Sequence, residues 1–390
     1  MHRSEAVIDL AAIAANVGVL KSNTAAELMA VVKADGYGHG LVPSAQAAVA
    51  GGASWLGVAV LEEALALRAA GFEQRVLAWL WTPHETDALR AALAADVDIS
   101  VSSMGGLELV VATAAELGST ARVHLKIDTG LSRNGATQAD WSALLADAAR
   151  AEAAEVIRVA GIWSHFVYAD QPGHPTTARQ IERFGEALQT AKAAGVVPEV
   201  RHLANSAATV TLPQAHFDLV RPGVAVYGLN PVPDAPGGDD FGLVPAMTLR
   251  SELANVKRVP AGEGVSYGHA YVLEADSTLG LVPLGYADGV PRSATNLGPV
   301  AIRGRRYTIS GRVCMDQFVV DLGEDEAVAG DEVLLFGPGT GGEPTAQDWA
   351  RALDTIHYEI VTRIGARVPR SYPTGEPPNH PTGDQPVETP

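Results

Sequence analysis

The chain has 390 residues, of which 47% are hydrophobic, and its formal net charge at pH 7 is −17. This length exceeds one ordinary domain and supplies enough apolar sequence for a large core, so we expect two domains. An acidic chain lacks the basic face that nucleic acids and anionic membranes require. Both are therefore excluded as the principal partner, and a small molecule is favoured.

The number of cysteines and the length of the apolar segments indicate the cellular compartment of the protein. Cys314 is the only cysteine, so no disulfide can form within the chain and a reducing environment is expected. The start, MHRSEAVIDL, lacks the apolar core of a secretory signal. No segment approaches the ~18 uninterrupted apolar residues of a membrane span. We therefore expect a cytoplasmic protein with no membrane partner.

Short apolar runs rich in β-forming residues recur through the first 230 positions, and alanine-rich segments with helical periodicity lie between them. Eight such β/α units in roughly 230 residues predict a (β/α)₈ barrel of the TIM type. The expected strands are ELMAVVK ending at Lys33, SWLGVAV at Val60, RVLAWLW at Trp81, VDISVSS at Ser103, RVHLKID at Asp128, VAGIWSHF at Phe166, EVRHLAN at Asn205, and a last one starting at 218–220.

An open, doubly wound sheet would show the same alternation of strands and helices. Its first strand-to-helix turn would carry a glycine fingerprint for a dinucleotide, G-x-G-x-x-G. The turn after the first run reads DGYGHG, which does not match. The barrel is therefore the favoured fold.

Polar side chains lie at or near the carboxyl ends of several expected strands. These side chains are Lys33, Lys126, His165, Asn205 and Arg221. Because the active site of such a barrel lies at the carboxyl ends of its strands, we expect them to meet at one mouth.

The sequence pattern changes after about residue 240, where runs rich in β-forming residues are joined by glycine and proline turns. We predict a (β/α)₈ barrel over 7–235, a β-rich C-terminal domain over 240–373 and a linker within 232–242. The tail, 374–390, is rich in Pro, Gly and acids, and we expect it to be disordered.

One helix is expected late in the second domain, in the segment TAQDWARALDTIHYEIVTRIG. Thr345 can cap its start, with Asp348 at the capping-box position. Gly365 is expected to end it.

Nine motifs in order resemble the alanine racemases, enzymes of fold type III that use pyridoxal 5'-phosphate. The resemblance extends from about residue 7 to Tyr372. The motifs are VVKADGYGHG, HLKIDTGLSRNG, SHFVYAD, HLANSAA, RPGVAVYG, VSYGHAY, PLGYADG, GRVCMDQ and TIHYEIVTRIGARVPR.

The resemblance implies two catalytic acid/base residues, because inversion of a stereocentre needs one group on each face. Lys33 matches the lysine that holds the cofactor as a Schiff base and serves one face. Tyr267 matches the base of the other face, which in this family comes from the partner subunit of a homodimer with shared sites. A free tyrosine titrates near ~10, so such a base needs positive charge nearby, and Arg133 and His165 are the candidates.

The resemblance also supplies a set of cofactor contacts. Arg221 matches the arginine that donates a hydrogen bond to the pyridine nitrogen, and an always-charged donor there leaves that nitrogen unprotonated. The full set is Lys33, Tyr37, His165, Asn205, Ser206, Arg221, Gly223, Val224 and Tyr358.

The amino-acid substrate would be held by Arg133 and by the backbone of Met315 from the partner chain. Lys126 matches a position that is carbamylated in many relatives. No metal ion is implied. The segment TIHYEI departs from the family, since His357 stands where asparagine is common.

The activity implied is interconversion of L-alanine and D-alanine, with D-alanine supplied to cell-wall peptidoglycan. One alternative is a racemase for another or broader set of amino acids, although such enzymes bear a secretory start and paired cysteines. A second is a fold type III decarboxylase, which uses a cysteine from the second domain, as Cys314 suggests. A non-catalytic carrier of pyridoxal phosphate is a third, but it would not need the second domain.

Overall fold

The computed structural model describes residues 3–235 and 241–373 and contains the predicted barrel. All neighbouring strands in its eight-stranded sheet pair in parallel, in the order β8-β7-β6-β5-β4-β3-β2-β9. The eight predicted strands are confirmed, each shorter than expected. They are β2 (Glu27–Val31), β3 (Trp55–Val58), β4 (Arg75–Ala78), β5 (Asp98–Val101), β6 (Ala121–Lys126), β7 (Ile157–Trp163), β8 (Val200–His202) and β9 (Leu219–Val220).

Two backbone hydrogen bonds bring the ends of this sheet together into a nearly closed barrel. Asp218 N donates to Arg201 O at 3.1 Å, and Arg221 N donates to Ala204 O at 3.0 Å. Apolar side chains from five strands pack inside the barrel, as is usual for this fold. They are Met29, Trp55, Leu77, Val200 and Leu219.

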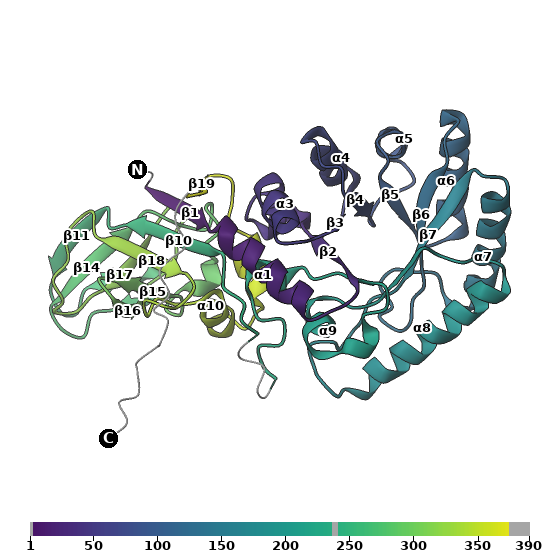
Figure 1. Cartoon of the computed structure of the whole chain (residues 1–390). Coiled ribbons are helices and arrows are strands. Elements are labelled where there is room, and N and C mark those ends of the chain that lie inside the picture. Colours follow the sequence, from purple (N-terminus) through teal and green to yellow (C-terminus); the bar gives the residue numbers. More distant parts are fainter. Residues whose placement is uncertain (1–2, 236–240, 374–390) are drawn as a thin grey trace, which may run out of the picture.

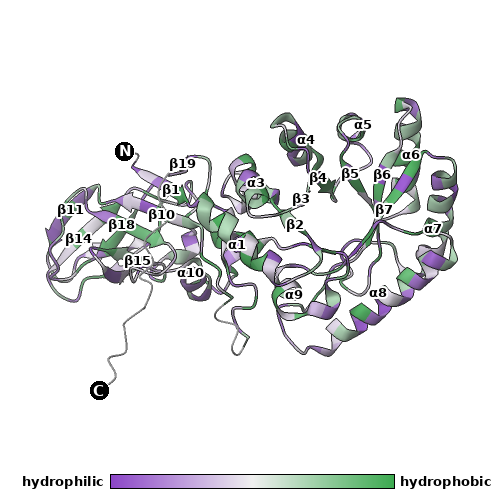
Figure 2. Cartoon of the chain, in the orientation of Figure 1, coloured by the Kyte–Doolittle hydropathy of each residue, from purple (hydrophilic) through white to green (hydrophobic). Residues whose placement is uncertain are grey.

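Helices cover the outside of the barrel (Figure 1). Helix α8 shows why such segments fold: its buried residues recur every three or four positions, and Figure 2 shows apolar and polar residues alternating along it. The helical elements of this domain, among which α2 is a left-handed turn at the mouth, are α1 (Leu10–Ser22), α2 (Lys33–Tyr37), α3 (Leu41–Ala50), α4 (Leu61–Ala69), α5 (Thr86–Ala94), α6 (Met104–Leu117), α7 (Gln138–Ala153), α8 (Pro175–Ala193), α9 (Ser206–Thr211), η1 (Pro213–Ala215) and η2 (Val224–Tyr227).

The second domain is mainly β, as predicted, and forms the left lobe of Figure 1. It contains a six-stranded sheet in the order β16-β15-β18-β10-β1-β19, a three-stranded sheet, β11-β14-β17, and the pair β12-β13. The elements are β10 (Met247–Glu252), β11 (Asn255–Val259), β12 (Gly264–Val265), η3 (Tyr267–His269), β13 (Tyr271–Val272), β14 (Ser277–Val282), η4 (Arg292–Ala294), β15 (Pro299–Ile302), β16 (Arg305–Thr308), β17 (Phe318–Asp321), β18 (Glu332–Phe336), α10 (Ala346–Ala352), α11 (His357–Thr362) and β19 (Arg370–Ser371).

The sheet of the second domain also contains the start of the chain, which the sequence pattern did not indicate. Strand β1 (Ser4–Ile8) pairs antiparallel with β10, Ser4 opposite Ser251, and parallel with β19. The two domains are therefore joined twice, once through β1 and α1 and once through the connection before β10.

The single helix expected from Thr345 to Gly365 is wrong, because the segment forms two short helices. The predicted start is confirmed: Thr345 and Asp348 form a capping box at α10. The helix then ends before Asp354, which adopts a left-handed φ of 53°, and α11 starts at His357. Asp and Thr favour turns and caps over helix interiors, which accounts for the break at Asp354 and Thr355.

Two expectations fall partly or wholly outside the described residues. They concern the disordered tail, 374–390, and positions 236–240 of the linker. No helix in the described ranges is both long enough and apolar enough to cross a membrane.

Candidate active site

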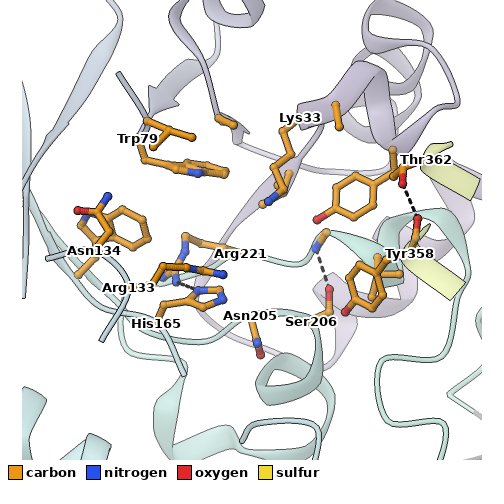
Figure 3. A pocket seen from close by; sticks show the side chains of 18 of the residues that line it. Lys33, Trp79, Arg133, Asn134, His165, Asn205, Ser206, Arg221, Tyr358 and Thr362 are labelled. Atoms are coloured by element: carbon orange, nitrogen blue, oxygen red, sulfur yellow. Dashed lines mark hydrogen bonds between the residues drawn. The ribbon is translucent and has the colours of Figure 1, made fainter. Parts of the chain in front are cut away.

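The mouth of the barrel contains a cavity of ≈ 810 Å³, in the size range of small-molecule sites. Figure 3 shows side chains from separate strands converging on it. Eleven of the predicted site residues line it: Lys33, Tyr37, Lys126, Arg133, His165, Asn205, Ser206, Arg221, Gly223, Val224 and Tyr358.

Lys33 reaches the cavity from a left-handed turn rather than from a strand. Strand β2 ends at Val31, and the four residues after Lys33 all have positive φ, 54°, 53°, 61° and 53°. Such backbone is unfavourable for residues other than glycine, so the turn needs external support. Asp35 gives part of it by accepting a hydrogen bond from Leu41 N at 2.8 Å.

The electrostatic setting of Lys33 favours its neutral amine. Burial and the charge of Arg133 lower the pKa of Lys33, although Glu63 opposes the shift. The Nζ atom of Lys33 lies 5.7 Å from the centre of the Trp79 ring. A lysine with a lowered pKa in a cavity is suited to nucleophilic attack on a carbonyl group.

Lys126 and Arg221 lie near the face of one tryptophan, Trp163, at 4.2 Å and 4.9 Å from the ring centre. Burial, Arg221 and Arg133 lower the pKa of Lys126 to about 7. A neutral lysine amine can react with carbon dioxide, so the setting suits the carbamylation implied by the resemblance.

Burial and the nearby charge of Arg221 hold the pKa of His165 well below its ordinary value. This shift disfavours the cationic form of the His165 ring, so Arg133 is the stronger of the two expected sources of positive charge for Tyr267. The loop that carries Arg133 is held by Asp128 Oδ1, which accepts hydrogen bonds from three successive backbone N–H groups of residues 130–132.

The far side of the cavity forms a compact cradle. Ser206 Oγ accepts hydrogen bonds from Gly223 N at 2.7 Å and Ala225 N at 3.3 Å. A Cβ atom at Gly223 would lie 2.3 Å from the hydroxyl oxygen of Tyr37, so only glycine fits there. Burial raises the pKa of Tyr37, and it raises the pKa of Tyr358 to about 12, so both hydroxyls remain protonated donors.

These residues fit pyridoxal phosphate. Two lysines and two arginines line the cavity, and no Asp or Glu does so among the described residues. This arrangement suits an anionic phosphate, and the hydroxyls of Ser206, Tyr37 and Tyr358 around Gly223 can donate hydrogen bonds to it. Lys33 supplies the amine that the aldehyde of the cofactor requires.

Two predicted residues lie apart from this cavity. The side chains of Tyr267 and Met315 are exposed, at 72% and 54%, on the second domain. Neither lines the cavity. Large exposed side chains of this kind are available to a second subunit.

Several lining residues were not predicted. Trp79, Trp81 and Trp163 lie within predicted strands, where apolar residues are expected to lie in the core rather than at the mouth that these three face. Their position at strand ends, as with Lys33, was the available signal. Asn134 and Thr362 also line the cavity. Asn134 lies in a loop and Thr362 in a helix, and only tertiary packing brings these two segments to the cavity.

Comparisons with known proteins agree with the resemblance. Residues 8–231 match the family model for the alanine racemase N-terminal domain, and residues 246–372 match the C-terminal domain. The chain is 62% identical over 371 residues to an alanine racemase of Frankia casuarinae, with 95% of this chain and 96% of that protein covered. It is 59% identical over 373 residues to one of Salinispora arenicola, covering 95% and 99%. The crystal structure of alanine racemase from Streptomyces lavendulae superposes with a TM-score of 0.94 at 55% identity, covering 96% of this chain and 98% of that one.

Proposed function

The chain belongs to the alanine racemase family, a family of isomerases, and on this basis we propose that it interconverts L-alanine and D-alanine with pyridoxal 5'-phosphate bound at the barrel mouth. The observation that carries the proposal is the half-buried Lys33, whose pKa is lowered and which faces a cavity lined by cations. The D-alanine would serve peptidoglycan synthesis. We assign the activity to the cytoplasm, because the single cysteine suits a reducing compartment.

The protein's part in holding the cofactor follows from the lining of the cavity. Lys33 would bind it covalently, and Ser206, Gly223, Val224, Tyr37 and Tyr358 would surround its phosphate. Arg221 would donate to its ring nitrogen, with Asn205 and His165 nearby. When bound, the cofactor supplies an electron-accepting ring that stabilises negative charge at Cα of the substrate.

Two side chains would move the Cα proton. The amine of Lys33 takes or returns a proton on one face of the substrate. The phenol of Tyr267 from the partner subunit serves the other face. A group on each side is required because removal and return on the same side would restore the starting enantiomer.

Arg133 and the backbone of Met315 from the partner subunit would orient the substrate carboxylate. Carbamylation of Lys126 would place an anion beside Arg133 and fix its guanidinium, since charge-assisted hydrogen bonds are short and directional. The exposure of Tyr267 and Met315 supports a two-fold homodimer, in which each subunit completes the site of the other.

The proposal is tested by supplying purified full-length protein and pyridoxal phosphate with L-alanine, L-serine or L-lysine in separate reactions and separating the enantiomers by chromatography. D-alanine alone is expected. Equal turnover of all three would favour a broad-specificity racemase, and release of carbon dioxide would favour a decarboxylase. Lys33→Ala should abolish both the absorption band of the bound cofactor and turnover, whereas Lys192→Ala, an exposed lysine on α8, should change neither.

A further inference from the structure

A line of buried polar side chains crosses the barrel interior and ends at Arg221. His124 Nε2 lies 3.1 Å from Asp98 Oδ2, and His124 Nδ1 lies 2.8 Å from His202 Nε2. His202 Nδ1 lies 3.1 Å from Arg221 Nη1. The exposed fraction is 0% for the first three residues and 5% for Arg221. The line runs from the first residue of β5, through β6 and β8, to the residue after β9.

Every hydrogen bond along this line must be donated in the same direction, from Arg221 towards Asp98. A guanidinium only donates, so His202 Nδ1 must accept from Arg221 and therefore carries no proton. The proton of neutral His202 is then on Nε2, which donates to His124 Nδ1. His124 is in turn protonated on Nε2 and donates to Asp98, whose carboxylate only accepts. Both ends of the line require the same pair of tautomers.

The protein provides specific space and packing for the two rings. A Cβ atom at Gly161 would lie 2.2 Å from His124 Nδ1, so the glycine on β7 makes room for the ring. Trp163 stacks on His202 with centres 5.5 Å apart and an interplanar angle of 6°. Trp55 contacts His124 edge-on. Neither ring can turn freely in this packing, so the hydrogen-bond partners are fixed.

The far end of the line is anchored by charge. Burial acts to raise the pKa of Asp98, but the hydrogen bond from His124 and the charge of Arg122 outweigh it, and the pKa lies below its ordinary value. Arg122 Nε donates to Asp98 Oδ1 at 3.0 Å, and its two terminal nitrogens donate to Glu199. Asp98 is therefore an ionised acceptor at pH 7.

Within the described residues, the hydrogen-bond contacts of the Arg221 side chain all involve its two terminal nitrogens. Nη1 donates to His202, while Nη2 donates to the carbonyl oxygens of Ser164 at 2.9 Å and Leu203 at 3.2 Å and lies 3.4 Å from His165 Nδ1. Among the described residues Arg221 forms no ion pair with a carboxylate, and its Nε–H has no hydrogen-bond partner. The guanidinium is thus held by its two terminal nitrogens, and Nε–H remains for a ligand.

We propose that Asp98, His124 and His202 are positioning residues that hold the guanidinium of Arg221 so that its Nε–H meets the ring nitrogen of the cofactor. The proposal rests on the proposed function, because the cofactor contact of Arg221 comes from it. It extends the site by three residues, Asp98, His124 and His202, none of which lines the cavity.

Asp98→Asn should reverse the line. The amide oxygen of the new side chain would accept from the charged Arg122, which turns its NH₂ group towards His124 Nε2. His124 and His202 would then both carry their protons on Nδ1, and the N–H of His202 would face an N–H of Arg221. A buried contact between two donors is unfavourable, so we expect binding of pyridoxal phosphate to weaken about 10-fold to 100-fold.

The experiment combines two measurements on the full-length protein labelled with ¹⁵N-histidine. Long-range ¹H–¹⁵N spectra of the cofactor-loaded protein report which ring nitrogen of His124 and His202 is protonated. An absorbance titration gives the dissociation constant for pyridoxal phosphate. Wild type should show Nε2–H for both rings, and Asp98→Asn should show Nδ1–H with the weaker binding. Nδ1–H in wild type, or unchanged binding by folded Asp98→Asn, would overturn the proposal.

A second pair of variants, at His124, distinguishes a role in hydrogen bonding to Arg221 from a role in packing alone. It tests the proposal even if Asp98→Asn does not fold. His124→Gln keeps one acceptor for His202 and one donor for Asp98, so binding should stay within about 3-fold of wild type. His124→Phe keeps the ring shape but leaves His202 Nε2–H without an acceptor, so binding should weaken about 10-fold or more. The reverse order would show that only packing matters. His216→Phe, which removes a buried ring whose contact is Thr209 O, is the control and should leave cofactor binding unchanged.

Failure of this inference and failure of the proposed function are distinguishable. A wild-type protein that does not bind pyridoxal phosphate contradicts the proposed function, while its histidine tautomers still test the line. A wild-type protein that binds the cofactor but has the other tautomers contradicts the line alone.

Discussion

The carboxylate of Glu63 accepts a hydrogen bond of 2.6 Å from the backbone N–H of Ala34, the residue that follows Lys33. Its other oxygen accepts from Ala59 N at 3.0 Å and Val60 N at 3.3 Å. One side chain on α4 thus joins the loop after β3 to the left-handed turn that carries Lys33. Since left-handed backbone costs roughly 1–2 kcal/mol for each residue that is not glycine, this tether supports the position of the lysine.

Glu63→Gln should loosen that turn. A glutamine has one acceptor atom in place of two, so one of the two loops loses its partner. We expect about 10-fold weaker binding of pyridoxal phosphate, the size of one hydrogen bond to a charged acceptor. An absorbance titration measures it. Glu62→Gln, an exposed neighbour on the same helix, should bind as wild type does, and equal losses in both variants would contradict the tether.

The rate of cofactor uptake should depend on pH through Lys33. Only the neutral amine attacks the aldehyde, and burial and Arg133 lower the pKa of Lys33 below 10.5. The rate should therefore rise with pH and reach half its maximum below 10.5. In Glu63→Gln the half-maximum should move lower still, because the charge of Glu63 raises this pKa. Stopped-flow absorbance measures both curves, and a half-maximum at or above 10.5 in wild type would contradict the assignment.

Tyr267→Phe should impair one direction of racemisation more than the other. The phenol serves one face only, so removal of its proton-transfer group should slow deprotonation of one enantiomer about 100-fold to 10,000-fold. Hydrogen exchange at Cα, measured separately with L- and D-alanine in deuterated water, reports each deprotonation. Tyr271→Phe removes a hydroxyl that donates to Asp321 in the same domain and should leave both rates intact. Equal, small losses for the two enantiomers in Tyr267→Phe would count against two bases.

Acid should destabilise the fold in part through His357. Burial lowers the pKa of His357 to about 4, and neither ring nitrogen has a hydrogen-bond partner among the described residues. The unfolded chain binds the proton near ~6.5. The free energy of unfolding therefore falls as pH drops from about 6.5 towards about 4, by roughly 1.4 kcal/mol per pH unit for this group, and is unaffected above that window.

His357→Leu should flatten this dependence, because the variant has no proton to gain on unfolding at that position. Denaturant melts at pH 5 and pH 8 measure the difference. His84→Leu, at an exposed histidine, is the matched control and should keep the wild-type slope. If His357→Leu lost stability equally at both pH values, the histidine would not be the acid-sensitive group.

Local patterns were sufficient to predict the barrel. Each strand is a short apolar run, and parallel order places the ends of such runs at one mouth, so Lys33, Lys126 and Arg221 could be brought together from the sequence. The roles assigned to Tyr267 and Met315 came from the resemblance and not from local pattern, since both lie on the surface of the other domain.

Other features depend on contacts between distant segments. Strand β1 pairs with β10 across more than 200 residues, and nothing in its five residues specifies that partner. The same holds for the line from Asp98 to Arg221, whose members sit on four different strands or their ends. The break at Asp354 was visible only as a weak turn signal within a helical pattern.

The claim that one site uses Lys33 of one subunit and Tyr267 of the other is tested most directly by complementation. Lys33→Ala and Tyr267→Phe chains are produced separately and co-expressed, and racemisation of L-alanine is measured. A mixed dimer has one site with both residues and one with neither, so a random mixture should recover about one quarter of wild-type activity, while each variant alone stays inactive. No recovery in verified mixed dimers would contradict the shared site, because a site built within one chain could never regain both residues.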